Sequence, residues 1–407
     1  MINNSLQYCV GTGSSNTWNP VSGWIDISVA GDNEINLLVT RGGGVGFTVK
    51  VGDGTGTYNI DWGDETIITS LTGDDATVRQ HQYTTGGVVC SLGYETWKIR
   101  IYGASGNITA WKVARHSFLL REQHSPILWA VFNTPGILTF ENAFYNATGN
   151  AVKSDLLEAC TVGPLTACIK MDYMFHYCNN LKSVTFPVTW GAVTTLKNTF
   201  NRCTSLQNII LPSNWGNVTD ITSMFSYCTG LTGVILPSSW GLIAVLSHTF
   251  SYCYSLSEIT LPNETISDSP IWNLAAMFID CWSLRKINNI DKLGTTKWSS
   301  SFYGTFDNLE SFEDPIHIYG NTEKFSCCGT LNFPNKIHEV RFFGTQQFDG
   351  SGIQVDVSYC SMNAQELDIL FNDLPTLSGR TILITGNPGS STCDQTIATG
   401  KGWIVTN

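Results

Sequence analysis

The chain has 407 residues, with 22 Lys and Arg against 33 Asp and Glu, which gives a formal net charge of −11 at pH 7. Only 14% of the residues are charged, against about 25% in an average soluble domain. The acidic balance and the lack of any Lys/Arg cluster argue against nucleic acid or an anionic membrane as a partner. No apolar run approaches the ~18 residues of a membrane span, so we expect no membrane insertion.

Residues 1–23 contain neither the basic segment nor the apolar core of a secretory signal. We expect this stretch to form an N-terminal arm, and the protein to be made in a reducing cytosol. Disulfides are rare in that compartment. The thirteen cysteines therefore need an explanation other than a set of disulfides.

Residues 24–115 alternate apolar and polar side chains in the way that is typical of β-strands. The clearest segments are 47–51, 58–60 and 97–101. A turn of sequence Asp61-Trp62-Gly63-Asp64 follows the second segment, and His81 and Tyr83 lie downstream of it. Asp61 and Asp64 either accept hydrogen bonds from their own backbone amides, as acids in glycine turns commonly do, or bind calcium.

Residues 116–170 form a linker with degenerate copies of the pattern that follows, around Phe140 and Phe144. A clear repeat then occupies residues 171–360. Segments that start at Phe175, Phe200, Phe225 and Phe250 align without gaps at a spacing of 25 residues, and a fifth starts at Phe278. We expect further degenerate coils after it, among them Phe325-Ser-Cys-Cys328 through Leu331.

Four repeats carry Phe-x-x-Cys-x-x-Leu-x-x-Val/Ile-x-Leu/Phe, and the fifth keeps all of it except the last position. The pattern predicts stacked coils with one short strand per coil and an apolar interior. The alternation within each strand divides it into inward and outward positions. The two outward columns are Ser183/Asn208/Gly233/Glu258/Lys286 and Thr185/Ile210/Ile235/Thr260/Asn288. Because exposed apolar side chains mark contact sites, we predict a binding surface here. Its candidate residues are Thr185, Asn208, Ile210, Ile235, Glu258 and Thr260.

Two further columns each allow two interpretations. Cys178, Cys203, Cys228, Cys253 and Cys281 recur once per coil, and they fit small buried thiols better than metal ligands or disulfides, since no Cys-x-x-Cys pair accompanies them. The second column is Trp190, Trp215 and Trp240, which either seals the interior as an aromatic stack or offers ring faces to a carbohydrate.

Residues 361–407 depart from the repeat and predict a small α/β cap. Asn363 and Glu366 form the signature of a helix start, four apolar residues follow at helical spacing, and Pro375 ends the helix. Segments 381–385 and 403–406 have the composition of strands. Solenoids need such a piece to cover the last coil.

Three resemblances extend these predictions. The Asp-Trp-Gly-Asp turn with its downstream His-x-Tyr resembles the signature of PKD-like β-sandwiches, although Glu65 stands where that signature has glycine. The repeat resembles BspA-like leucine-rich repeats. Together they imply a mainly β fold, with a PKD-like β-sandwich followed by a leucine-rich-repeat parallel β-solenoid and the α/β cap. The combination is similar to virion structural proteins of tailed bacteriophages of the marine type.

That resemblance implies a non-enzymatic virion component, in the tail, a fibre or the surface decoration, that acts in assembly or host attachment. Its partners would be other virion proteins, further copies of the chain and a host-surface glycan or protein. The alternative is a bacterial surface adhesin. A polysaccharide-degrading enzyme is a third possibility, but it would need paired carboxylates in a groove. The seven histidines show no catalytic or metal-binding spacing, and we expect no cofactor.

Overall fold

The computed structural model describes residues 30–407 except for 41–43, 75, 84–86, 90–94, 115–122, 147–151, 240, 264–272, 290–299, 303–305, 308–315, 320–321, 330–333, 335, 344–347 and 349–351. The chain forms two compact units, residues 1–212 and 213–407. Each unit is described by itself. The predicted arm, residues 1–23, lies outside the described residues.

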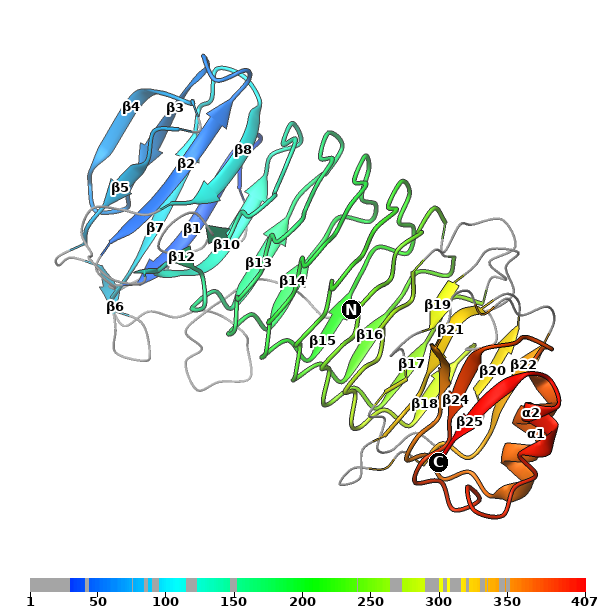
Figure 1. Ribbon diagram of the computed structural model, residues 1–407. Helices are drawn as coiled ribbons and strands as arrows, with labels where there is room; N and C mark the ends of the chain where they lie inside the picture. The colour runs from blue at the N-terminus through cyan, green and yellow to red at the C-terminus, as the bar shows by residue number, and fades with distance from the viewer. Residues whose placement is uncertain are drawn as a thin grey trace. The chain divides into compact units, whose positions relative to one another are not determined.

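Unit 1 begins with a module of two antiparallel sheets (Figure 1). One sheet has the order β10-β1-β7-β3-β4, with β6 also paired to β7, and the other has the order β5-β2-β8. The strands are β1 (Glu34–Thr40), β2 (Val45–Val51), β3 (Thr57–Asp61), β4 (Ile67–Thr72), β5 (Arg79–His81), β6 (Val88–Val89), β7 (Glu95–Tyr102), β8 (Ile108–Val113) and β10 (Ile127–Asn133). The three predicted strand segments are confirmed as β2, β3 and β7.

Both sheets of this module continue into the coils of unit 1. Strand β10 pairs antiparallel with β1 but parallel with β13 (Ala159–Val162), which in turn pairs parallel with β14 (Ser183–Thr185). On the other side, parallel bridges run from Ala110 of β8 to Thr139, then to Lys170 and Thr195. Parallel pairing from one coil to the next therefore begins within residues 116–170. A small sheet of β9 (Gln123–His124), β12 (Val152–Lys153) and β11 (Tyr145–Asn146) adjoins them.

A column of phenylalanine rings fills the coils of unit 1. Phe144, Phe175 and Phe200 are fully buried, and each ring stacks on the next with centroids 5.4 Å apart. The backbone follows the same order, because Phe144 N–H donates to Met174 and Phe175 N–H donates to Thr199. Ring stacking and backbone hydrogen bonds thus bind each coil to its successor.

The cysteine column is buried, as predicted, and it has a second role. All five side chains are fully buried. Cys203 Sγ donates to the carbonyl of Phe175 in the previous coil at 3.2 Å, and Cys253 does the same to Phe225. A thiol fits here because it is small and apolar yet supplies one weak donor.

Each coil turns through two residues with positive φ that are not glycine. The pairs are Tyr173/Tyr177, Asn198/Arg202, Ser223/Tyr227, His248/Tyr252 and Ala276/Asp280. Such backbone costs about 1–2 kcal/mol per residue. Cross-coil hydrogen bonds offset that cost, as where Tyr173 N–H donates to Lys197 and Tyr177 N–H donates to Asn201.

Unit 2 contains further coils with parallel pairing, and Figure 1 shows their strands. Strands β17 and β18 pair with each other, as do β20 and β22, and a five-stranded sheet has the order β19-β21-β23-β24-β25. The strands are β16 (Gly233–Ile235), β17 (Glu258–Thr260), β18 (Lys286–Asn288), β19 (Ser300–Phe302), β20 (Ile316–Tyr319), β21 (Thr322–Ser326), β22 (Val340–Phe343), β23 (Gly352–Asp356), β24 (Arg380–Leu383) and β25 (Trp403–Thr406). The two strands expected near the C-terminus are confirmed as β24 and β25, and they extend the parallel sheet of the coils.

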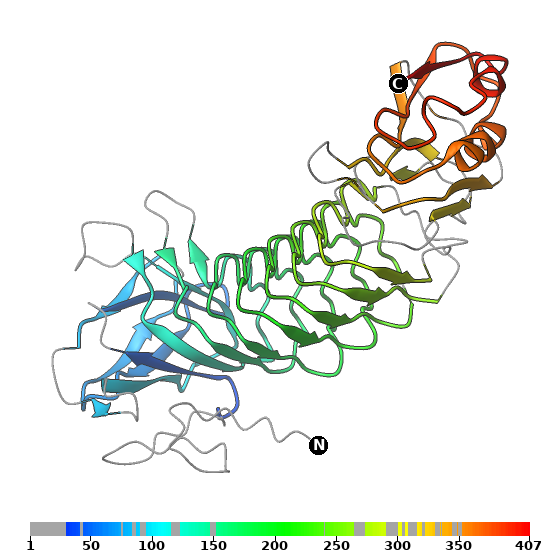
Figure 2. The same cartoon turned by 90° about the horizontal axis from the view of Figure 1, so that it is seen from below.

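The predicted helix is α1 (Ala364–Asp373), and a short α2 (Thr396–Thr399) was not predicted. Figure 2 shows both helices, in orange and red, at the end of unit 2 that carries β25. Asn363 caps α1 and forms the predicted reciprocal pair with Glu366.

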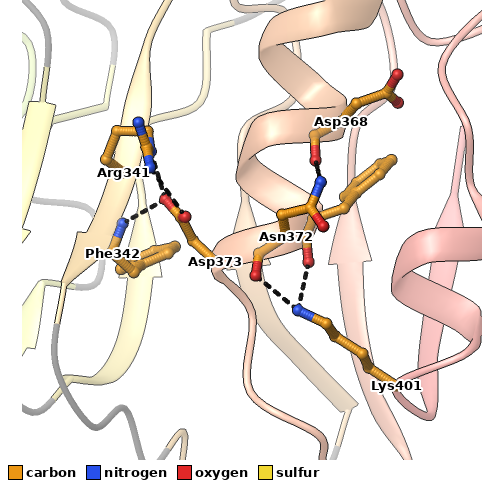
Figure 3. Close-up of polar contacts among 7 residues, drawn as sticks. Arg341, Phe342, Asp368, Asn372, Asp373 and Lys401 are labelled. Carbon is orange, nitrogen blue, oxygen red and sulfur yellow. Dashed lines mark hydrogen bonds and ion pairs between the residues drawn. The ribbon is translucent and has the colours of Figure 1, made fainter.

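The C-terminal end of α1 is held by two charged side chains that the sequence did not indicate (Figure 3). Arg341 of β22 binds Asp373 through two nitrogens, at 2.6 and 3.2 Å. Lys401 Nζ donates to the carbonyls of Phe371, Asn372 and Leu374 at 3.1, 2.6 and 2.7 Å. A cation is favourable here because the last carbonyls of a helix lack partners and carry partial negative charge.

Candidate functional site

Most outward positions of the coil strands are exposed, as the alternation predicted, but Thr185, Gly233 and Asn288 are half-buried. In unit 1, Asn208 and Ile210 of β15 (Asn208–Ile210) are exposed, Ile210 at 71%, while Ile209 between them is buried and Thr185 is half-buried. In unit 2, Ile235 is 64% exposed. The predicted division fails at three inward positions, since Phe186, Val234 and Leu236 are only half-buried.

Strands β17 and β18 in unit 2 carry a polar network on this face. Asn288 Nδ2 donates to Glu258 Oε1 at 2.7 Å and to Thr260 Oγ1 at 3.0 Å. Lys286 Nζ lies 3.9 Å from Glu258 Oε1, and both side chains are more than half exposed. An ion pair this exposed contributes little to stability, so these groups remain available to a partner. The structure therefore brings Glu258 and Thr260 together.

These outward positions offer donors, acceptors and isolated apolar side chains, but not paired acids. Among the described residues of the two columns, Glu258 is the one acidic side chain. Each unit therefore has its own strand face, which is Thr185, Asn208 and Ile210 in unit 1 and Ile235, Glu258 and Thr260 in unit 2.

The carbohydrate interpretation of the tryptophan column is wrong for two of its members. Trp190 is 1% exposed and Trp215 is 3% exposed, so neither ring offers a face to a ligand. Trp190 instead packs against Phe186, with centroids 5.6 Å apart. The third member, Trp240, lies outside the described residues.

The turns of unit 1 carry an aromatic cluster that the motif search missed. The rings of Tyr145 and His176 each contact Tyr177, at centroid distances of 5.7 and 4.4 Å. Lys153 Nζ and Arg202 Cζ lie 5.1 and 5.2 Å from the centre of the same Tyr177 ring. Cations over a tyrosine ring are attracted by its quadrupole. The signal in the sequence was a tyrosine immediately before the column cysteine.

His176 in this cluster is a neutral side chain near pH 7. Burial lowers its pKa to about 4, and the charges of Arg202 and Lys153 act in the same direction, against a hydrogen bond to the backbone of Asn201. The cluster therefore presents rings and cations rather than a nucleophile beside a base.

A similar aromatic arrangement occurs in unit 2. Tyr227 stacks on Tyr252 with centroids 4.1 Å apart, and Tyr254 stacks on Trp282 at 4.3 Å. Trp282 is 44% exposed. Stacked rings cover one another's faces, so these pairs chiefly hold neighbouring coils together.

The Asp-Trp-Gly-Asp turn and the downstream His-x-Tyr meet in space. His81 Nε2 lies 2.6 Å from Asp64 Oδ2, and Tyr83 Oη donates to the carbonyl of Trp62 at 2.8 Å. Asp61 and Asp64 accept hydrogen bonds from the backbone amides of Gly63 and Thr66. The interpretation as a backbone turn is therefore confirmed.

The pKa of Asp64 reflects these contacts. Burial raises it, but the hydrogen bonds from His81 and Thr66 outweigh that effect and leave it below its ordinary value. No cluster of three metal-ligating side chains occurs in the part of the chain that the structure describes.

Glu65 in this turn provides a stability test. Its φ is +69°, a left-handed conformation that side chains disfavour and glycine adopts freely. We expect Glu65→Gly to raise the free energy of unfolding by about 1 kcal/mol in urea denaturation. Glu141→Gly, at an exposed residue outside the set with positive φ, is the control, and we expect it to bring no gain. An equal or larger gain in the control would contradict strain at Glu65.

Comparison with known families identifies the repeats. The family described as BspA type leucine-rich repeat region matches residues 169–274 and 225–354, in six copies. These residues are therefore BspA-type leucine-rich repeats, in a mainly β chain of stacked coils. No helix within the described residues is long and apolar enough to cross a bilayer.

No curated protein matches the chain. Among solved structures, the crystal structure of a TLR13-ssRNA13 complex aligns with 68% of this chain and 54% of that one, at 12% identity and a TM-score of 0.18. The chain thus spans about half the length of that protein.

Proposed function

We propose that this chain is a non-enzymatic recognition protein that binds its partner through the strand faces of its two units. The observation that carries the proposal is the exposure of the apolar side chains of Ile210 and Ile235, at 71% and 64%, on strands whose other outward positions are Asn208 and Gly233. The buried ladders of Phe and Cys hold those strands in place. Rigid strands lower the entropy that binding costs.

The setting we propose is the virion of a tailed bacteriophage, where the chain would serve in assembly or host attachment. The resemblance of the first module to PKD-like domains supports this setting, because His81 lies within hydrogen-bond distance of Asp64 in the signature turn and Tyr83 donates to the carbonyl of Trp62 there. The BspA-type repeats also favour the second candidate, a bacterial surface adhesin. Either setting uses the same strand faces, on a host glycan, a host protein or another subunit.

A binding assay separates recognition from catalysis. The purified full chain is incubated with a panel of bacterial cells and with their purified envelope polysaccharides, and both the bound protein and the newly formed reducing ends are measured. We expect protein to sediment with at least one strain and no reducing ends to form. Accumulating reducing ends would contradict the proposal, as would a lack of binding to every cell and every polysaccharide.

A further inference from the structure

Two buried sulfurs in unit 2 lie unusually close together. Cys327 Sγ and Cys360 Sγ are 3.8 Å apart, and the side chains are 0% and 2% exposed. Cys360 Sγ also lies 3.2 Å from the carbonyl of Cys327. Cys327 lies outside the regular cysteine column, so the close approach of the two sulfurs needs a reason of its own.

The coil register supplies that reason, because Cys327 occupies the place of the column phenylalanine. Phe225 N–H donates to the next coil, and its carbonyl accepts from Cys253 Sγ at 3.2 Å. Cys327 N–H likewise donates to Asp356, and its carbonyl accepts from Cys360 Sγ at 3.2 Å. A cysteine in the phenylalanine place is too short to fill it, so its sulfur meets the sulfur of the following coil.

The coil after this one shows which side chains fill the same two places without sulfur. Val357 stands in the phenylalanine place and is buried. Asn387 stands in the cysteine place, and its Nδ2 donates to the carbonyl of Val357 at 2.7 Å. Valine and asparagine are thus the residues that the protein itself uses at the equivalent positions of the following coils.

From this geometry we infer that Cys327 and Cys360 form a disulfide between neighbouring coils when the protein meets a small disulfide oxidant such as oxidised glutathione. One thiolate attacks the oxidant, releasing one glutathione thiolate and leaving a mixed disulfide. The second thiolate then attacks the protein sulfur and releases the second glutathione. Two electrons pass to the oxidant and two thiol protons leave. Closing to an S–S bond of ~2.05 Å needs a movement of about 1.8 Å.

The reaction is expected to be slow. Burial, together with the hydrogen bond with Cys360, raises the pKa of Cys327 well above its ordinary value, so little of the reactive thiolate is present. Both sulfurs are enclosed, so attack requires local opening of the coil. The cross-link suits a protein that leaves a reducing compartment for an oxidising one, and it does not depend on the strand faces.

The test compares four full-length proteins: wild type, Cys327→Val, Cys360→Asn and Cys328→Ser. Each is incubated with oxidised glutathione at increasing temperature, denatured and alkylated, and its remaining thiols are counted by mass spectrometry. Cys328 is the matched control because it neighbours Cys327 but is only half-buried. We expect wild type and Cys328→Ser to lose two thiols without gaining glutathione mass. The other two variants have no partner sulfur to release a bound glutathione, so we expect no protein disulfide in them, and any lost thiol should carry the mass of one glutathione.

The cross-link is also expected to raise the melting temperature of the wild type by about 5 °C, a gain that dithiothreitol removes. Retention of all thirteen thiols by the wild type up to its melting temperature would overturn the inference. Loss of two thiols without added glutathione mass in Cys327→Val or Cys360→Asn would also overturn it, because the disulfide would then join other cysteines.

Discussion

Replacing Phe144 by alanine is expected to lower the free energy of unfolding by about 3–5 kcal/mol, the range for a buried phenylalanine in a packed core. Its ring is fully buried between the two modules of unit 1. It contacts Trp111 of β8 at 5.2 Å and Phe175 of the next coil at 5.4 Å. The loss combines removed apolar contact with a cavity that these rings cannot fill.

This effect tests whether the first module closes the N-terminal end of the coils. Exposed coil ends must be covered for a solenoid to remain soluble. Phe144 connects the two modules, because its ring packs against Trp111 of the first module and its N–H donates to Met174 of the next coil. Urea unfolding of the wild type, Phe144→Ala and the milder Phe144→Leu measures it. A loss below about 1 kcal/mol in Phe144→Ala would contradict a shared core.

We expect the carboxyl of Asp307 in unit 2 to make the folded state more stable in mild acid than at neutral pH. Burial raises the pKa of its carboxyl to about 6, and the charge of Asp356 adds to that effect, against hydrogen bonds from Ser326 and Cys328. Ser326 Oγ and Cys328 N donate to Asp307 Oδ1 at 2.6 and 3.1 Å.

The direction follows from the raised pKa. Protonation favours the folded state, so the contribution is complete below the ordinary pKa of 3.8 and is lost as the pH rises through about 6. Asp307→Asn keeps an acceptor for both donors but removes the charge. We expect its gain in unfolding free energy over the wild type to be about 2 kcal/mol larger at pH 7.5 than at pH 4.5.

Denaturation at both pH values checks this difference. The control is Glu258→Gln, whose side chain is 56% exposed, and its effect is expected to change little with pH. An equal gain in unfolding free energy for Asp307→Asn at the two pH values would contradict titration of the Asp307 carboxyl between them.

The repeat made most of the coil architecture predictable. Column spacing placed Cys203 and Leu206 inside and Asn208 and Ile210 outside, because a strand alternates its faces and a coil repeats its contacts. The start of α1 was equally predictable, because Asn363 and Glu366 are close in sequence and bond to each other.

Long-range features were not predictable. Strand β10 has one antiparallel and one parallel partner, and nothing in its own residues specifies both. The register at Phe325-Ser-Cys-Cys328 was also misjudged. The motif pointed to Cys328 as the buried column residue, but Cys327 is buried and Cys328 is half-buried. Pairing with β23 sets that register, and this pairing has no local sequence signal.

The candidate site was predictable in position but not in content. The strand faces followed from alternation alone, whereas the rings around Tyr177 required turns with positive φ at tyrosine and arginine. Such backbone is stabilised by cross-coil hydrogen bonds, which a single sequence does not reveal. The equal spacing of the tryptophans also suggested carbohydrate binding, which the burial of Trp190 and Trp215 rules out for these two residues.

The most direct test of the proposed function measures sedimentation of the labelled full chain with a strain that binds it. Ile210→Asp and Ile235→Asp each place a charge on the strand face of one unit without touching the interior. Val188→Asp, at a residue that is 86% exposed and outside both strand faces, is the control. We predict that each strand-face variant weakens binding at least about tenfold, the effect of ~1.4 kcal/mol, while the control binds like wild type. Unchanged binding by both strand-face variants would contradict recognition through these surfaces.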